Sequence, residues 1–283
     1  MIPIRIIRRR IRSIKSTAKI TKAMEMIAAS KMRQAQLRVL AARPYSEKMR
    51  EVLAHLAAQP RAEGESHPLL HHREVKRITV VHVTGDRGLC GGLNANMNRR
   101  TTSFLLEQQV PTNLVTVGRK GRDFMSRYGR ELRAEFTQLG DKPALVDTTP
   151  ISRVVIDDYT NKLTDEIYLA YTQFISTVIQ RPALWKLLPI EPTKFERTEN
   201  IDYIYEPSPA VVMGELLPRY VEMQIYHAIL ESIASEQSAR MVAMRNATDN
   251  ANEMIDDLTL TYNKARQELI TKELLDIAGG VVQ

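Results

Sequence analysis

The sequence from residue 241 to residue 269, MVAMRNATDNANEMIDDLTLTYNKARQEL, decides the fold. Its apolar and small side chains follow alternating steps of three and four residues through four heptads, the spacing of a helix in a left-handed coiled coil. The positions are Met241, Met244, Thr248, Ala251, Ile255, Leu258, Tyr262, Ala265 and Leu269. They lie between Pro218 and Gly279, in 60 residues without Gly or Pro, so one very long helix is predicted.

A second long helix is predicted at the other end of the chain, because no Gly or Pro occurs between Pro3 and Pro44. Its apolar stripe begins at Ile4, Ile7, Ile11 and Ile14, is expected to drift to Ile20, Met24 and Ile27, and resumes beyond Pro44 at Met49, Val52, Leu53 and Leu56. The simplest burial of both stripes is an antiparallel pair of helices. The alternative is two separate amphipathic helices packed on a globular core.

Between these helices the pattern changes to strands that alternate with shorter helices. The predicted strands cover 76–84, 113–118, 166–174, 176–190 and 201–207, and the predicted helices cover 93–109, 119–129 and 151–166. The fold class is therefore α+β or α/β: a long antiparallel two-helix coiled coil from the terminal segments, with an inserted Rossmann-like α/β domain. The predicted parts are the N-terminal coiled-coil helix at 1–58, the α/β domain at 59–208 and the C-terminal coiled-coil helix at 209–283.

The positive charge is concentrated at the start of the chain. Residues 1–50 hold fourteen Lys or Arg against two acidic residues, a net charge of +12, whereas the whole chain carries +7. Such a segment predicts an acidic partner, which leaves nucleic acid, an anionic membrane surface and an acidic protein loop as candidates. Against nucleic acid, no aromatic residue precedes Tyr45 to stack on bases. Residues 1–24 as a basic amphipathic helix are the membrane alternative.

The compartment is predicted to be intracellular. Cys90 is the only cysteine, so no intrachain disulfide can form. No apolar run approaches the ~18 residues of a membrane span, and MIPIRIIRRR lacks the apolar centre of a secretory signal. An organellar transit peptide is the alternative for this arginine-rich start, but the helical pattern continues from it without a break, so we expect mature protein.

A glycine-rich stretch, TGDRGLCGGLN at 84–94, raises the alternative of a nucleotide-binding enzyme. Its glycines match neither GxGxxG nor a P-loop, and a tight strand-to-helix corner is the favoured interpretation. No nucleophile arrangement surrounds Cys90, and no Cys or paired carboxylate completes a metal site with His67, His71 and His72. We therefore predict no catalytic residues, no cofactor and no metal.

Three segments, in order along the chain, resemble the gamma subunit of F-type ATP synthase. They are RRIRSIKSTAKITKAMEMIAASKMRQAQ at 9–36, DRGLCGGLNANMNR at 86–99 and SEQSARMVAMRNATDNANEMIDDLTLTYNKARQELITKELLDIAGG at 235–280. The resemblance implies a central-stalk rotor without an active site of its own. Its coiled coil would stand inside the ring of alpha and beta subunits, and its α/β domain would contact the c-subunit ring and the epsilon subunit, without nucleic acid and without direct membrane insertion.

The resemblance also implies which residues contact beta and the stator. They are Lys19, Lys22, Ala23 and Met24 in the first segment and Arg240, Arg266, Gln267 and Thr271 in the last. The final residues, LLDIAGGVVQ, resemble the apolar tip that turns in a hydrophobic sleeve. The cysteine pair of the plant chloroplast forms is missing, so we expect a bacterial complex on the cytoplasmic face of the plasma membrane, with a mitochondrial mature form as the alternative.

Overall fold

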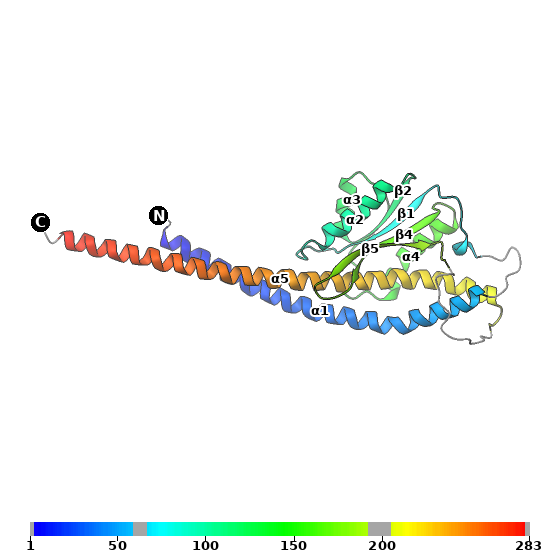
Figure 1. Ribbon diagram of the computed structural model, residues 1–283, viewed down its shortest axis with the longest axis horizontal. Coiled ribbons are helices and arrows are strands. Elements are labelled where there is room, and N and C mark those ends of the chain that lie inside the picture. The colour runs from blue at the N-terminus through cyan, green and yellow to red at the C-terminus, as the bar shows by residue number, and fades with distance from the viewer. Residues whose placement is uncertain (1–2, 59–66, 192–204, 281–283) are drawn as a thin grey trace. The chain divides into compact units, whose positions relative to one another are not determined.

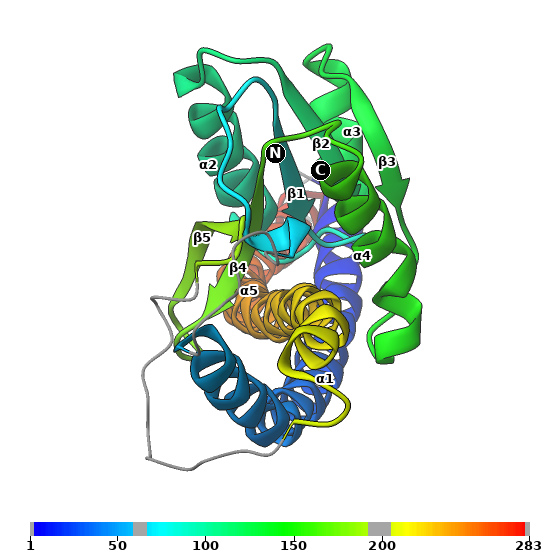
Figure 2. The same cartoon turned by 90° about the vertical axis from the view of Figure 1, so that its right-hand side faces the viewer.

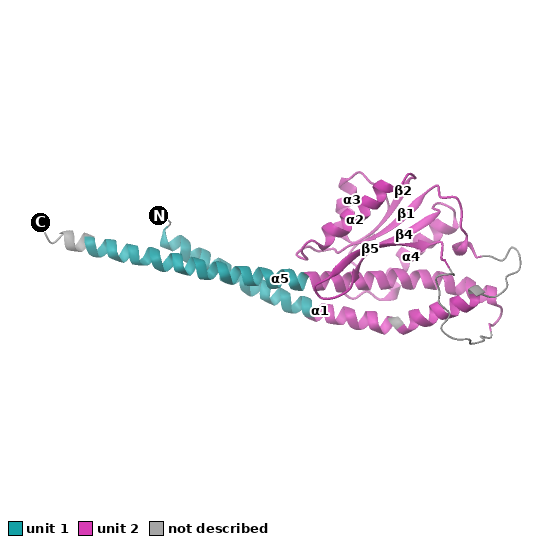
Figure 3. Ribbon diagram, viewed as in Figure 1, with its two compact units in different colours: residues 1–29, 240–283 teal, residues 30–239 magenta. Residues whose placement is uncertain are grey.

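The computed structural model describes residues 3–58, 67–191 and 205–280 (Figure 1). It contains two compact units (Figure 3). We call Met1–Ala29 with Arg240–Gln283 the helical unit, and Ser30–Ala239 the sheet unit. The helices α1 (Ile4–Ala58) and α5 (Pro209–Gly280) each contribute to both units. The boundaries of the units therefore differ in kind from the predicted three-part division of the sequence, which stays a prediction.

Both long helices continue through the proline that limits the stretch without Gly or Pro in the sequence. Pro44 lies within α1 and Pro218 within α5. An internal proline costs about 3 kcal/mol, because one backbone hydrogen bond is lost and the ring crowds the carbonyl four residues earlier. Buried side chains of the sheet unit follow each proline closely, Met49 and Leu53 in α1 and Tyr220 and Val221 in α5. Their burial offsets the cost and keeps each helix continuous.

A five-stranded sheet forms the centre of the sheet unit. Its strands are β1 (Ile78–Val83), β2 (Thr112–Val117), β3 (Leu132–Phe136), β4 (Glu166–Phe174) and β5 (Gln180–Leu188). The order is β3-β2-β1-β4-β5, and every pair is parallel except β4 and β5. All six residues of β1 are buried, as expected of a central parallel strand covered on both faces.

Helices cover both faces of this sheet (Figure 2). On one face, α2 (Leu93–Glu107) and α3 (Arg119–Arg127) pack Met97, Phe104 and Met125 against β1 and β2. On the other face lies the larger core, to which α4 (Leu145–Thr160), α5, α1 and the short helix η1 (Pro68–Leu70) all contribute. The predicted fold class is thereby confirmed: long terminal helices in contact and an α/β sheet inserted between them.

One predicted helix has different bounds in the structure, and one strand was missed. The helix predicted at 151–166 is α4, and it starts six residues earlier, where Asp147 accepts the Ala144 N–H. It also ends earlier, because Lys162 adopts a positive φ of 59° and the N–H groups of Lys162 and Leu163 bond back to Tyr159 and Asp158. No strand was predicted at β3. The strand predicted at 201–207 falls largely outside the described residues.

Candidate functional site

The helical unit buries a continuous seam between α1 and α5. On α5 the seam follows the predicted spacing, with Met244, Thr248 and Ala251 buried and Ile255, Leu258, Tyr262 and Ala265 half-buried. Leu269 is exposed instead of buried. On α1 the predicted drift is wrong, because Ile20 and Ile27 are exposed and the stripe continues from Ile14 through Ala18, Thr21 and Ala28. Beyond Ile14, small side chains thus take the place of isoleucine in the α1 half of the seam.

Two polar contacts fix the antiparallel register of this seam. The hydroxyl oxygens of Thr21 and Thr248 lie 2.7 Å apart in a buried hydrogen bond. Further along, Arg8 Nη2 donates to the Tyr262 hydroxyl at 2.7 Å, and its guanidinium lies 5.6 Å from the centre of the tyrosine ring. This hydrogen bond lowers the pKa of Tyr262. Because Thr21 follows Arg8 while Thr248 precedes Tyr262, the helices run in opposite directions.

The outer face of α1 carries the predicted contact residues. Lys19, Lys22 and Ala23 are exposed, and Met24 is half-buried. Three large apolar side chains on the same stretch are also exposed, namely Ile20, Met26 and Ile27, with exposed fractions of 58%, 60% and 55%. Exposed apolar side chains that cluster in this way mark an interaction surface rather than an ordinary solvent-facing one. We refer to the exposed residues of this stretch as the α1 outer face, namely Lys19, Ile20, Lys22, Ala23, Met26 and Ile27.

The predicted contact residues of α5 divide into two groups. Arg266, Gln267 and Thr271 are exposed. Arg8 of α1 pairs with Tyr262 of α5, so the first residue of α1, Ile4, lies opposite the turn around Arg266. Beyond that turn, α5 has no other described helix beside it. Leu269, Ile270, Leu274 and Leu275 are exposed in the same unpaired stretch. Arg240 differs from these, because it is only 8% exposed and already has an interaction partner within the chain.

The glycine-rich loop connects β1 to α2 and also reaches the start of α3. Asp86 accepts the N–H groups of Arg119 and Gln138 at 2.9 and 3.0 Å. The next two N–H groups of α3 donate to the Gly85 carbonyl and to Thr84 Oγ1. The first three donors of α3, where an anion could otherwise bind, are therefore all occupied by the loop itself. This geometry shows that the loop serves as a structural corner at the start of α3.

The close approach at this corner requires two glycines in particular. A Cβ on Gly118, whose φ is +96°, would lie 2.1 Å from the Thr84 carbonyl oxygen. A Cβ on Gly121 would lie 2.6 Å from the ring of His82. Glycine at these positions lets α3 approach β1 more closely than any side chain would allow.

Side chains with catalytic potential do not converge in the described parts of the chain. Cys90 is buried, and its sulfur lies 3.3 Å from the amide nitrogen of Asn94. Residues 67–191, with the described parts of the helices, contain no group of three His, Cys, Asp or Glu side chains that could hold a metal ion. In the same residues no helix combines the length and apolarity needed to cross a bilayer.

Two polar clusters were not predicted from the sequence. Asp141, in the loop before α4, accepts hydrogen bonds from Lys31 of α1 at 2.6 Å and from Gln237 of α5 at 3.0 Å. His82, near the end of β1, lies between Asn98 and Thr101 of α2. The first cluster joins residues about 100 positions apart, and no local sequence signal marks such a contact.

Comparisons with known proteins identify this combination of helical seam and inserted sheet. The family described as ATP synthase matches residues 3–282. The ATP synthase gamma chain of Dehalococcoides mccartyi strain 195 is 61% identical over 99% of this chain and 98% of its own length. The chain belongs to the ATP synthase gamma family. It is a gamma subunit of the central stalk, and within the complex it is a non-catalytic subunit.

More distant gamma chains and solved structures agree with this assignment. The ATP synthase gamma chain of Chloroflexus aurantiacus strain J-10-fl is 51% identical over 97% of this chain and 96% of its own length. The central stalk and c-ring structure of the Tetrahymena thermophila mitochondrial ATP synthase contains a chain with a TM-score of 0.62 at 26% identity, covering 81% of this chain and 99% of that one. A Euglena gracilis mitochondrial chain shares the fold, with a TM-score of 0.69 at 22% identity over 99% and 93% of the two chains.

Proposed function

We propose that this gamma subunit couples proton-driven rotation of a c-subunit ring to the conformational cycling of catalytic beta subunits, reversibly and without chemistry of its own. Its partners in this proposal are the alpha and beta subunits, the epsilon subunit and the c ring. The location is the cytoplasmic face of a bacterial plasma membrane, where the chain is a peripheral part of the complex. The high identity to bacterial gamma chains supports that location.

The observation that carries this proposal is the α1 outer face. Ile20, Met26 and Ile27 remain exposed although α1 has already paired with α5. Burying an isoleucine or methionine side chain is worth about 1.5–3 kcal/mol, so these residues favour a partner that covers them. Lys19 and Lys22 on the same stretch add positive charge and favour an acidic loop on that partner. We assign the covering partner as beta.

The polar residues at the end of α5 complete the proposed contact set. Arg266, Gln267 and Thr271 are exposed on a stretch that no other helix of the helical unit covers. They are therefore free to meet stator loops as the subunit turns, each orientation favouring a different state of the catalytic subunits by its contact energy. Arg240 belongs to this set by resemblance alone, and its burial leaves little of its side chain for a partner.

The experiment is co-expression with alpha and beta and measurement of ATP hydrolysis. We expect the full chain to support rapid hydrolysis, and a chain truncated before Arg240 to lose that effect because the α5 half of the seam is missing. The sharper variant is Lys19→Glu combined with Lys22→Glu, which reverses two exposed charges on the α1 outer face. It should lower hydrolysis several-fold.

The matched control is Lys142→Glu combined with Arg153→Glu, which reverses two exposed charges of the sheet unit. This control should keep hydrolysis near that of the unmodified complex. Equal loss in both charge-reversal variants would show that overall charge, rather than the α1 outer face, is responsible. ATP turnover by the purified chain alone would overturn the non-catalytic role.

A further inference from the structure

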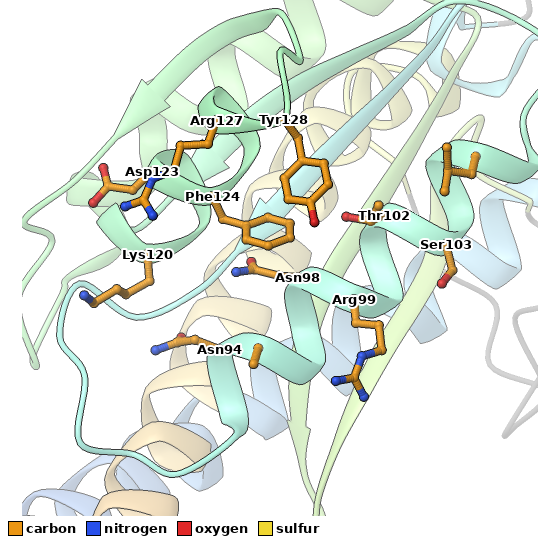
Figure 4. A pocket seen from close by; sticks show the side chains of 12 residues that line it. Asn94, Asn98, Arg99, Thr102, Ser103, Lys120, Asp123, Phe124, Arg127 and Tyr128 are labelled. Atoms are coloured by element: carbon orange, nitrogen blue, oxygen red, sulfur yellow. The ribbon is translucent and has the colours of Figure 1, made fainter.

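An open cleft of about 540 Å³ lies between α2 and α3 in the sheet unit (Figure 4). Its volume falls within the range of small-molecule sites, roughly 300–1,000 Å³. Helix α2 contributes Asn98, Arg99 and Thr102, and helix α3 with its C-cap residue contributes Lys120, Phe124 and Tyr128. None of the residues predicted to contact beta and the stator lines this cleft.

Asn98 is a fixed polar group at the floor of the cleft. It is only 6% exposed, and its amide oxygen lies 2.8 Å from His82 Nε2. His82 Nδ1 lies 2.9 Å from the Thr101 hydroxyl, which can donate to it when Nε2 carries the proton. This chain of hydrogen bonds holds the amide oxygen inward. The amide nitrogen of Asn98 has no partner among the described residues and is left as a donor toward the cleft.

Three cations share the cleft with this donor. Arg99, Lys120 and Arg127 line the cleft, and none of them forms a salt bridge with a described residue. The single carboxylate of the lining, Asp123, already accepts two hydrogen bonds from Arg122, at 3.0 and 2.8 Å. Both of these bonds go to Asp123 Oδ1, and the carboxylate also interacts electrostatically with Arg127. One partly neutralised carboxylate thus faces three cations and an amide donor, and this excess of positive charge favours an anionic ligand.

The other side of the cleft is aromatic. The rings of Phe124 and Tyr128 lie 4.6 Å apart, centre to centre, and are tilted by 33°. Figure 4 shows the Phe124 ring over Asn98 and the Tyr128 hydroxyl directed toward Thr102. The hydroxyl oxygen of Thr102 is buried and has no hydrogen-bond partner among the described residues. An aromatic ring of a ligand that stacks here could also form a hydrogen bond from its edge to the Thr102 hydroxyl.

We propose that this cleft binds a small organic phosphate that carries a flat aromatic ring, the chemical class of the nucleotides. The phosphate meets Lys120, Arg99 and the amide nitrogen of Asn98, and the ring stacks beside Phe124 and Tyr128. This site differs from the glycine-rich loop, where Asp86 already occupies the start of α3. Binding here adds a ligand to the sheet unit and involves no covalent step.

The experiment is isothermal titration calorimetry of the full-length chain with three probes, namely ADP, adenosine and inorganic phosphate. We expect saturable binding of ADP with a Kd below about 1 mM, and weaker binding of adenosine and of phosphate, because each supplies only half of the contacts. Absence of saturable ADP binding would overturn the proposal. Phosphate that binds as tightly as ADP would show that the aromatic side contributes nothing, and would overturn the proposed ligand class.

The sharpest variant is Asn98→Asp, which keeps an oxygen for His82 and replaces the cleft-facing donor by a carboxylate oxygen. It should weaken ADP binding about tenfold or more, since a charge-assisted hydrogen bond becomes a repulsion. The matched control is Asn96→Asp, which adds the same charge to an exposed position of α2 outside the cleft lining. ADP should bind this control within about twofold of the unmodified chain. Equal weakening in both variants would overturn the site.

Arg99→Ala provides a second test if Asn98→Asp perturbs folding, because Arg99 is exposed and its removal leaves the core intact. It is compared with Arg100→Ala, the exposed neighbour that does not line the cleft. Only Arg99→Ala should weaken ADP binding. Unfolding curves by circular dichroism confirm that each variant is folded before titration.

Discussion

The hydroxyl groups of Thr21 and Thr248 meet at 2.7 Å between the two long helices. Each hydroxyl also lies within hydrogen-bonding distance of a carbonyl of its own helix, that of Ala18 or Met244. One threonine can therefore donate to its own helix while the other donates across the interface. A polar pair of this kind favours one register over its neighbours, because any shift would bury a hydroxyl against apolar side chains.

This pair leads to the first prediction, a double-mutant cycle. Thr248→Val and Thr21→Val should each reduce stability by about 1 kcal/mol, and the double variant should lose less than the sum, because no hydroxyl is then left without its partner. Native-state hydrogen exchange of the amides around residue 248 measures the change. The control is Thr261→Val, which removes an exposed hydroxyl bonded to its own helix at Asp257. Strict additivity would show that the cross-helix bond contributes nothing.

The second prediction concerns the Asp141 carboxylate, which holds the loop before α4 to Lys31 and Gln237. Both charged groups are about a third exposed, so Asp141→Ala should cost only about 1 kcal/mol in global stability. Locally the effect should be larger, and amide exchange in residues 138–142 should accelerate. Lys142→Ala, on the same loop and exposed, is the control. Unchanged exchange in Asp141→Ala would exclude the tether.

The third prediction compares two glycines that share a positive φ. Gly118→Ala should destabilise the chain by more than about 3 kcal/mol, because the added Cβ meets the Thr84 carbonyl oxygen at 2.1 Å and the backbone itself must move. Gly91→Ala should destabilise the chain by only about 1–2 kcal/mol. This is the strain of placing alanine at a φ of +59°, since no atom lies within 4 Å of the added Cβ. Chemical unfolding measures both, and equal effects would contradict the crowded corner.

The fourth prediction is a pH dependence caused by His82. Burial lowers the pKa of His82 from 6.5 to about 4. Because the folded state binds the proton more weakly than the unfolded state, the stabilisation is complete above pH 6.5 and is lost as the pH falls toward 4. The loss amounts to about 3 kcal/mol for a shift of this size.

Unfolding titrations between pH 7 and pH 4 test this dependence. His82→Gln should flatten the curve, and His72→Gln, in the exposed connection before β1, should leave it unchanged. Proton NMR of the imidazole gives an independent measurement, in which His82 should remain neutral at pH 5. A His82 signal that titrates near pH 6.5 would contradict the prediction.

The sequence determines the architecture where side-chain spacing alone is decisive. The seam of α5 from Met244 to Ala265 was predictable, because one face of a long helix must be covered and its periodicity persists for four heptads. Strands β1, β2, β4 and β5 were predictable from their runs of β-branched and aromatic residues. The glycine-rich corner could be separated from known phosphate-binding patterns by spacing alone.

Other features depend on contacts that periodicity does not encode. Ala18, Thr21 and Ala28 form the α1 seam although Ile20 and Ile27 are more hydrophobic, because close helix packing selects small side chains. Strand β3 has only five residues, which alternate Leu132, Ala134 and Phe136 with charged ones, too short a pattern for a clear signal. The tether of Asp141 and the cleft around Asn98 join distant segments, so they became visible only in three dimensions.

The side chains at the unpaired end of α5 make no contribution to the stability of the fold. From Glu268 to Leu275 every described side chain is exposed, and none contributes to the seam or to the sheet. Substitutions in these turns can therefore alter how the subunit fits its surroundings while leaving its own folding unaffected. Such a segment can change in sequence together with the surface that encloses it. The buried threonines and the crowded glycine corner tolerate far fewer substitutions.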